Sequence, residues 1–232
     1  WGSVARQLAT DRYHVVVPDL RNHGQSPHAA DHAYPAMAAD LRGLLDQLGL
    51  KDAVVVGHSM GGKAAMHLAL TSPDRVAALV VVDIAPVSYL HDFDAVLNAF
   101  DAVDFDAIDK RADAEAQMKP YVDAAGLRAF LMQNLVQQDG QWRWRLNLKA
   151  LAENSAAITG FPEIPDTHRY LGPTAFIHGE DSDYVVASYH SRIHSLFPQA
   201  TIGAIEGAGH WVYADQPDAF FTALRGFLQN AV

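Results

Sequence analysis

The chain has 232 residues, of which half are hydrophobic, 19% are charged and none is cysteine. This length suits one α/β domain with a large core and room for an inserted subdomain. The lack of cysteine excludes disulfides, thiolate nucleophiles and zinc–thiolate sites. The formal net charge of −10 disfavours nucleic acid and anionic membrane surfaces as partners because their phosphates would repel the protein. No apolar run approaches the ~18 residues of a membrane helix.

The chain begins at Trp1 rather than at methionine, and residues 2–9 already follow a helical pattern. We therefore expect natural sequence upstream of Trp1, so these residues do not decide whether a signal peptide precedes them. A chain without cysteine is compatible with a reducing compartment, and the expected location is the cytoplasm.

Strand-like and helix-like segments alternate along the chain. Short apolar, β-branched runs predict strands, whereas apolar residues at a spacing of three or four predict helices. The predicted strands span residues 13–18, 53–56, 76–82, 174–178 and 200–205, and helices are expected at residues 2–9, 36–48, 62–70 and 217–228. Near-continuous apolar strands that alternate with helices indicate an α/β fold with a mostly parallel sheet covered by helices on both faces.

One long segment, residues 88–164, contains no predicted strand. Its helical candidates span residues 93–102, 112–119, 126–136 and 146–158. One alternative is that these helices cover the sheet in the ordinary way, but so many in succession have no strand to pack on. We therefore predict a helical lid over residues 88–164, inserted above the strand ends of a core formed by residues 1–87 and 165–232.

The pentapeptide Gly57-His58-Ser59-Met60-Gly61 lies between a predicted strand and a predicted helix. In this context the motif predicts a sharp strand–turn–helix elbow that lifts the hydroxyl of Ser59 out of the sheet edge. Small residues are needed at Gly57 and Gly61 because bulky side chains beside a strained turn would clash. The N-terminus of the following helix favours negative charge near the hydroxyl. The alternative is an ordinary glycine-rich turn.

A serine nucleophile needs a base, and the chain has 12 histidines. His210 is the candidate because the small-residue loop 207–211 follows the last strand and brings an imidazole over the sheet edge. His58 should point away from the site at a strand-to-helix elbow, so we expect a structural role for it. His190 and His194 are four residues apart, but without a carboxylate partner or an H-E-x-x-H motif we expect a solvated helix face and no metal.

A third residue must hold the useful tautomer of His210 and stabilise its imidazolium form. Asp83 ends the predicted strand 76–82, and Asp181 and Asp183 follow the predicted strand 174–178. The chain order of serine, aspartate and histidine fits either position, so these residues leave the choice of acid open.

Several phrases of the sequence resemble a known family. The elbow, the loop DLRNHGQS at 19–26 and the late Gly-His at 209–210 resemble the α/β-hydrolases. The phrases DIAP at 83–86, QNL at 133–135 and WRWRLNL at 142–148 are similar to the YbfF-type esterases, and the similarity runs over essentially the whole chain. The resemblance implies a serine carboxylesterase that works through an acyl-enzyme intermediate and needs no cofactor.

The same resemblance assigns roles to particular residues. Ser59 is implied as the nucleophile, His210 as the base and Asp83 as the acid. Ser182 occupies the position at which most α/β-hydrolases carry the acid, and in the YbfF-type pattern it is a fourth hydrogen-bonding member. The backbone N–H of Met60 is implied as one donor of the oxyanion hole.

The substrate implied is a small-molecule ester with a short or medium acyl chain. Trp142, Trp144 and Phe130 of the lid segment are candidates for an apolar acyl pocket, or else they form the core of the lid. The same nucleophile and base would also serve thioester or carbon–carbon bond hydrolysis. A third interpretation is a binding protein or an inactive or weakly active fragment.

The chain departs from the family at its N-terminal side. Such enzymes have an upstream strand, between the segments at 13–18 and 53–56, and a His-Gly loop that gives the oxyanion hole its second N–H. Without that strand, backbone groups would be left unpaired in a core. The expected outcomes are that residues outside this sequence fill the slot, that a second chain fills it, for example in a homodimer, or that the flanking strands pair directly. Loss of one donor costs on the order of 10²–10³ in rate, so the chain alone should be a weak catalyst or have a rebuilt hole.

Overall fold

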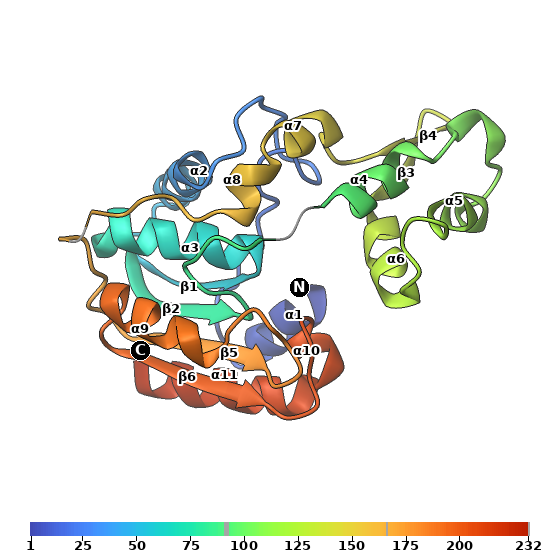
Figure 1. Ribbon diagram of the computed structural model, residues 1–232. Helices are drawn as coiled ribbons and strands as arrows, with labels where there is room; N and C mark the ends of the chain where they lie inside the picture. The colour runs from blue at the N-terminus through green and yellow to red at the C-terminus, as the bar shows by residue number, and fades with distance from the viewer. Residues whose placement is uncertain (91–92, 166, 232) are drawn as a thin grey trace. The chain divides into compact units, whose positions relative to one another are not determined.

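The structure, a computed structural model, describes residues 1–90, 93–165 and 167–231 (Figure 1). The first of its two units comprises Trp1–Pro18, Tyr34–Ser88 and Gly160–Val232, and the second comprises Asp19–Ala33 and Tyr89–Thr159. Each unit has a hydrophobic core of its own. None of the helices in this described part of the chain is long and apolar enough to cross a lipid bilayer.

The first unit is built on a four-stranded parallel sheet with the strand order β1-β2-β5-β6. Its strands are β1 (Ala53–His58), β2 (Val76–Val82), β5 (Thr174–Gly179) and β6 (Ala200–Ile205). Val80 of β2 pairs with Val56 of β1 and with Ala175 of β5, which sets the register. The predicted α/β architecture with a mostly parallel sheet is confirmed, and each of these strands begins at the residue expected from the sequence.

Helices cover both faces of this sheet. The helices of the first unit are α1 (Gly2–Thr10), α2 (Tyr34–Gln47), α3 (Met60–Thr71), α9 (Ala187–Leu196), α10 (Val212–Asp215) and α11 (Pro217–Ala231), with a 3₁₀ turn η1 at Pro73–Arg75. α2 and α3 lie on one face, and α1 and α11 lie on the other (Figure 1). Successive residues of a strand point to opposite faces, so a sheet covered on both sides requires strands that are apolar at nearly every position.

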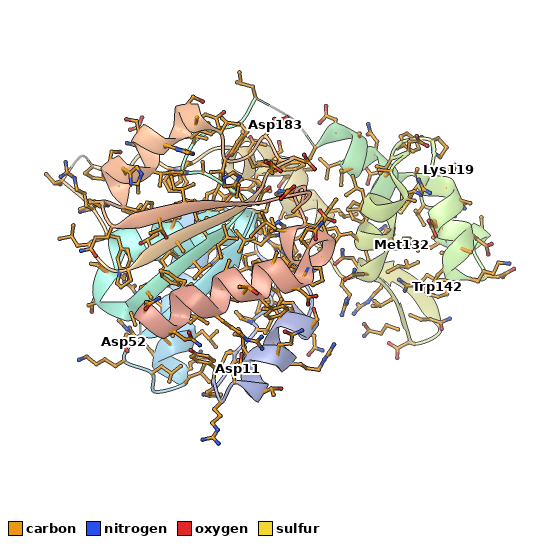
Figure 2. All side chains as sticks on the ribbon, turned by 90° about the horizontal axis from the view of Figure 1, so that it is seen from below. Asp11, Asp52, Lys119, Met132, Trp142 and Asp183 are labelled. Atoms are coloured by element: carbon orange, nitrogen blue, oxygen red, sulfur yellow. The ribbon has the colours of Figure 1, made fainter. Side chains whose placement is uncertain are left out.

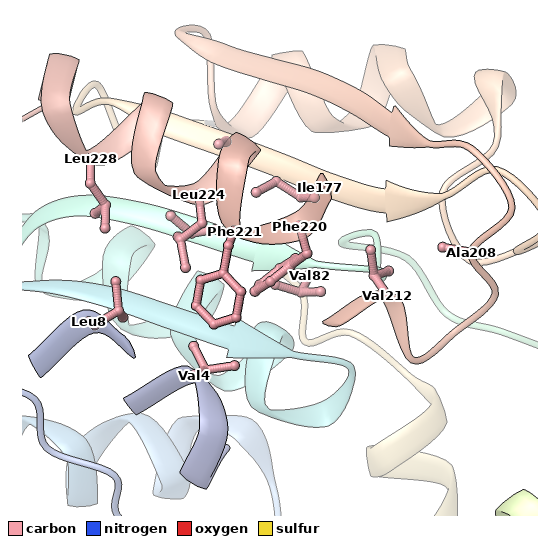
Figure 3. Packing of buried hydrophobic residues seen from close by; sticks show 12 residues of the cluster. Val4, Leu8, Val82, Ile177, Ala208, Val212, Phe220, Phe221, Leu224 and Leu228 are labelled. Atoms are coloured by element: carbon pink, nitrogen blue, oxygen red, sulfur yellow. The ribbon is translucent and has the colours of Figure 1, made fainter. Parts of the chain in front are cut away.

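The sheet face toward α1 and α11 carries a continuous hydrophobic core (Figure 3). Val82 of β2 and Ile177 of β5 belong to it, together with Phe220, Leu224 and Leu228 of α11. The three residues of α11 recur every four positions, which places them on one face of the helix. Burial of each such side chain stabilises the fold by roughly 1.5–3 kcal/mol.

The second unit combines short helices with a β-hairpin around its own core. Its elements are α4 (Asp94–Asp101), η2 (Phe105–Ala107), α5 (Arg111–Met118), α6 (Ala125–Leu131), η3 (Met132–Asn134), β3 (Leu135–Gln138), β4 (Gln141–Trp144), α7 (Leu148–Glu153) and α8 (Ser155–Thr159). Its core includes Phe100, Met118 and Leu135, all of which are buried. Most of the expected helices of this segment are therefore present.

The prediction that residues 88–164 are all helical is wrong in one place, because β3 and β4 form an antiparallel hairpin. Its two-residue turn, Asp139-Gly140, has φ values of 51° and 79°, as a type I′ turn requires. An Asp-Gly pair between two short runs is a strong hairpin signal. It outweighs the helical spacing of residues 126–136, whose helix α6 ends at Leu131.

The strand predicted at residues 13–18 does not form. The segment has no regular secondary structure, and among the described residues β1 pairs with β2 alone. Val15 packs against the core, whereas Val16 and Val17 are 41% and 52% exposed. Direct pairing of this segment with β1, one of the three expected outcomes, is therefore wrong. A β-branched run becomes a strand only where a neighbouring backbone takes up its hydrogen bonds.

Candidate active site

Ser59 lies at a sharp turn between β1 and α3. Its backbone has a φ of 52° and a ψ of −122°, a strained combination that costs on the order of 1–3 kcal/mol in a non-glycine residue. Its N–H donates to the carbonyl of Val82 at 3.0 Å, and its carbonyl accepts from the N–H of Lys63 at 3.1 Å. The end of β2 and the first turn of α3 therefore hold the elbow in place. Met60 is the first residue of α3, at the positive end of the helix dipole.

The glycines around this turn differ in what they permit. A Cβ at Gly57 would lie 2.3 Å from the carbonyl oxygen of Gly61, and a Cβ at Gly62 would lie 2.7 Å from the side chain of Ile84. A Cβ at Gly61 would meet no described heavy atom within 4 Å. The expectation that both glycines of the motif relieve a clash is therefore confirmed for Gly57 and wrong for Gly61. The second close approach is at Gly62.

Asp83 follows β2 and is fully buried, with a left-handed φ of 50°. Its Oδ1 accepts a hydrogen bond from the backbone N–H of Gly179 at 3.0 Å. Its Oδ2 accepts from Ser182 Oγ at 2.5 Å and pairs with His210 Nδ1 at 2.7 Å. Hydrogen bonds to an ionised carboxylate are shorter and stronger than neutral ones. They offset the cost of burying this side chain and fix its orientation.

The loop that carries His210 follows β6 and packs on the end of β5. A Cβ at Gly179 would lie 2.3 Å from the carbonyl oxygens of both Ala208 and Gly209, so only glycine allows this close approach. The backbone N–H of Asp181 donates to the carbonyl of Ala208 at 2.9 Å. The side chain of His210 retains 23% of its exposure, which leaves the imidazole open to a small molecule.

Among the three candidate acids, Asp83 is the one whose carboxylate pairs with His210. Asp181 and Asp183 are exposed residues of the loop after β5, in which Figure 2 labels Asp183. A buried carboxylate interacts more strongly with a developing imidazolium because the local dielectric constant is lower than at the surface. The geometry thus favours the residue at the end of β2 over those in the loop.

Ser59 and His210 are linked through His58. The described residues contain no hydrogen bond between Ser59 Oγ and the imidazole of His210, and in free enzymes this bond is often long until substrate binds. His58 Nε2 donates to the backbone carbonyl of His210 at 2.8 Å, and the two imidazole centroids are 4.6 Å apart. The ring of His58 thus packs on the His210 loop, and the contacts described for this side chain do not include Ser59, so the structural role expected for it stays an interpretation.

Two partly buried aromatic neighbours of His210 are held in their neutral forms. Burial, reinforced by the nearby His210, lowers the pKa of His58 to about 4. The ring centroid of Tyr184 lies 4.3 Å from that of His210, and burial, followed by the charge of Asp83, raises the pKa of this phenol. Tyr184 belongs to no motif, and its only signal in the sequence is its position two residues after Ser182, in the loop that the resemblance had indicated.

The three residues expected to line an acyl pocket all lie in the second unit. Trp144 Nε1 donates to the carbonyl of Phe100 at 3.2 Å, and the two rings meet edge to face with centroids 4.8 Å apart. Trp142, labelled in Figure 2, packs against the same core, and Phe130 is 44% exposed. Within this unit Trp144 is partly buried and packs against the core, and the role of all three in substrate binding stays a prediction.

Comparison with known proteins relates this geometry to a family. Residues 1–217 match the model of the family described as "alpha/beta hydrolase fold". The chain is 47% identical over 220 residues to the sn-1-specific diacylglycerol lipase ABHD11 of Mus musculus, covering 92% of this chain and 71% of that protein. It is 39% identical over 230 residues to the esterase YbfF of Escherichia coli (strain K12), and the match covers 99% of this chain and 87% of that protein. A solved structure of a marine microorganism esterase matches with a TM-score of 0.93 at 35% identity, over 98% of this chain and 89% of that one.

A parallel sheet with a serine elbow after β1 and a histidine loop after β6 defines the class of α/β-hydrolases. The chain belongs to the α/β-hydrolase fold family. Within that family it is a YbfF-like esterase, as the phrases at 83–86 and 142–148 had indicated, and it is a carboxylic ester hydrolase.

Proposed function

We propose that the chain is a serine carboxylesterase in which Ser59 is the nucleophile, His210 the base and Asp83 the acid, with Ser182 as a fourth hydrogen-bonding member. The observation that carries this proposal is the buried carboxylate of Asp83, which meets His210 Nδ1 at 2.7 Å and Ser182 Oγ at 2.5 Å. Ser59 stands at the end of the adjoining strand, in a strained turn. Backbone strain of this kind in a non-glycine residue clusters at functional sites.

The reaction runs in two halves. His210 Nε2 takes the hydroxyl proton as Ser59 Oγ attacks the acyl carbon, and Asp83 stabilises the imidazolium that forms. The tetrahedral intermediate collapses when His210 protonates the leaving alcohol, and an acyl group remains on Ser59. His210 then removes a proton from water, which attacks the acyl-enzyme. The carboxylic acid leaves, and Ser59 Oγ recovers its proton.

Met60 is the proposed oxyanion donor within this chain. It opens α3 directly after Ser59, so its backbone N–H adds to the positive end of the helix dipole. Negative charge on the carbonyl oxygen develops only in the transition state, and a donor placed there in advance stabilises that state more than the bound ester.

The proposed substrates are esters with short or medium acyl chains. Phe130, Trp142 and Trp144 are proposed as apolar residues of the acyl pocket. The name of the mouse relative, an sn-1-specific diacylglycerol lipase, makes a diacylglycerol the natural comparison substrate. Activity should therefore be measured across p-nitrophenyl acetate, butyrate, octanoate and palmitate, and on a dispersed diacylglycerol. Falling activity from butyrate to palmitate supports the proposal, and a preference for palmitate contradicts the assigned chain length.

The experiment that tests the chemistry compares the wild type with Ser59→Ala. We expect turnover of p-nitrophenyl butyrate by the wild type and the loss of essentially all of it in the variant, since removal of a serine nucleophile costs on the order of 10⁶ in kcat. Turnover that survives Ser59→Ala would refute the assignment. An acyl thioester assayed in parallel separates esterase from thioesterase, and ligand binding without any turnover would favour a binding protein.

Homodimer formation, at the edge of β1 that has no partner strand among the described residues, stays a prediction. Sedimentation equilibrium checks it. A mass of twice the 25.3 kDa chain supports the dimer, and a monomer mass at all concentrations contradicts it.

A further inference from the structure

His58 connects two parts of the active site that are far apart in the sequence. It is the last residue of β1 and directly precedes Ser59. Its Nε2 donates to the backbone carbonyl of His210 at 2.8 Å. Its ring lies 4.6 Å from the imidazole of His210 and 5.3 Å, edge on, from the ring of Tyr213. The residue beside the nucleophile therefore holds the loop that carries the base.

This bond fixes the backbone at His210 itself, whereas other bonds of the loop are made by Ala208 and Gly209. Among the described residues the imidazole of His210 makes one hydrogen bond, from Nδ1 to the carboxylate of Asp83, and its other contacts are ring packing against neighbours such as Tyr184. A single hydrogen bond leaves a ring free to turn about that bond, and a misplacement of about 1 Å at a reacting group can cost on the order of 10² in rate. A fixed carbonyl at the same residue gives a second point. With both points fixed, the direction of Nε2 is set.

His58 is suited to this task because it stays uncharged. A neutral imidazole that donates from Nε2 keeps its Nδ1 unprotonated, and burial keeps the pKa of His58 near 4. An imidazolium forms on His210 in each half of the proposed reaction, and a second positive charge at this distance would oppose it. A lysine or arginine donor would hold the loop equally well but would work against that charge.

We propose that His58 is a positioning residue, which fixes the His210 loop through the hydrogen bond to the His210 carbonyl and thereby aims the base at Ser59. The inference rests on the proposed roles of Ser59 and His210. His58 does not touch the reacting atoms in this account, so it acts on the rate of the chemical step and not on substrate affinity.

The test uses a matched pair of variants, His58→Gln and His58→Met. Both side chains are unbranched and of similar length, but glutamine retains an N–H donor and methionine does not. Active sites are counted with a fluorophosphonate, and kcat and KM are measured per titrated site with p-nitrophenyl butyrate. We expect kcat in His58→Met to fall by about tenfold with an unchanged KM, and His58→Gln to recover most of that loss.

A spectroscopic readout separates positioning from mere folding. The proton shared by His210 Nδ1 and Asp83 Oδ2 gives a low-field proton resonance when the ring is held still. We expect this resonance in the wild type and in His58→Gln, and we expect it broadened or absent in His58→Met. If His58→Met does not fold, His58→Phe provides the second donor-free variant, because it retains an aromatic ring.

Equal kcat per titrated site in the wild type and in the donor-free variant would overturn the inference. Equal losses in the glutamine and methionine variants would overturn it as well, since the hydrogen bond would then not be the cause. The proposed function fails in a different way, through a wild type that neither reacts with the fluorophosphonate nor turns over ester. The resonance is measured without turnover, so it tests the role of His58 in either case.

Discussion

Two β-branched runs of this chain have opposite fates. Residues 76–82 form β2, which is hydrogen-bonded to a strand on each side and ends at Asp83. Residues 13–18 have a similar composition, yet they form no regular structure, and Val17 is 52% exposed. The comparison teaches that β-branched composition indicates a fit to a pleated surface, whereas a neighbouring backbone decides whether a strand forms.

The same difference explains where the chemistry can be placed. β2 is fixed by β1 and β5, so the residue that follows it, Asp83, can be held with a positive φ and with three hydrogen bonds. The segment at 13–18 has no such neighbouring strands within residues 1–90, 93–165 and 167–231. A strained, buried carboxylate would not persist there, because strain is retained only where the surrounding structure imposes it.

Asp83→Asn, at the end of β2, should have the largest effect of the variants considered, and the effect is on activity. An amide keeps the shape of the carboxylate, but it no longer stabilises the imidazolium of His210 and can favour the wrong tautomer. We expect kcat to fall by about 10⁴ with a small change in KM, as measured by steady-state kinetics on p-nitrophenyl butyrate. Asp181→Asn is the matched control, with an expected change below about twofold. A loss in Asp181→Asn as large as in Asp83→Asn would place the acid in the loop.

Gly57→Ala should destabilise the elbow next to β2. The new Cβ would lie 2.3 Å from a backbone oxygen of α3, and overpacking against backbone costs about 3 kcal/mol. Gly61→Ala offers the comparison, because a Cβ there meets nothing and alanine favours a helix over glycine by about 0.5–1 kcal/mol. Urea denaturation measures both. Equal losses of unfolding free energy in the two variants would contradict the geometry of the turn.

Lys63→Met tests the helix that covers this edge. Lys63 is buried, its Nζ donates to the carbonyl of Gly160 at 2.5 Å, and burial lowers its pKa from 10.5 to about 7. Between these two values the unfolded chain holds a proton that the folded protein has released, so the free energy of unfolding rises with pH. We expect the wild type to gain about 2 kcal/mol relative to the variant from pH 6 to pH 9.

Chemical denaturation of both proteins at the two pH values checks this dependence. The lost hydrogen bond to Gly160 lowers the stability of the methionine variant at either pH by a similar amount, so the comparison isolates the charge. Parallel pH profiles for the wild type and Lys63→Met would show that the lysine is not desolvated in the folded protein.

The two β-branched runs can be compared directly through the stability of one valine-to-threonine variant in each. Val81 is fully buried in β2 and Val17 is half exposed. Thr has nearly the shape of Val but brings a hydroxyl, whose burial without a partner costs about 1–3 kcal/mol. We therefore expect Val81→Thr to lose about 2 kcal/mol and Val17→Thr less than about 0.5 kcal/mol. Thermal and urea unfolding measure both, and a loss in Val17→Thr that equals the loss in Val81→Thr would mean that residues 13–18 are packed like a strand.

Most of the first unit was predictable from the sequence because its signals are local and agree with one another. β1, β2, β5 and β6 begin where the apolar runs begin, and the elbow at Ser59 lies between its strand and its helix as the motif indicated. The strand prediction that was wrong depends on residues that are distant in the sequence. The run at 13–18 pairs with no strand in the part of the chain that the structure describes, and periodicity alone does not reveal that.

The rest of the site was partly within reach of the sequence. The residues at 83 and 182 were named through a resemblance, whereas spacing left the acid open between two loops. The contacts of His58 and Tyr184 with His210 arise from the way in which three loop ends meet, which has no pattern along the chain. The hairpin at Asp139-Gly140 was predictable, unlike these contacts, because its turn signal is present in the sequence. The expectation gave more weight to the helical spacing of the residues before it.

The central claim is that Ser59 is made nucleophilic by an imidazole that a buried carboxylate holds in place. The most direct measurement is reaction of the folded wild type with a fluorophosphonate, followed by digestion and mass spectrometry of the modified peptide. We expect one equivalent of phosphonate per chain, on Ser59, with labelling slowed strongly by Asp83→Asn and abolished by Ser59→Ala. Labelling on another residue, or labelling that persists in Ser59→Ala, would contradict the account.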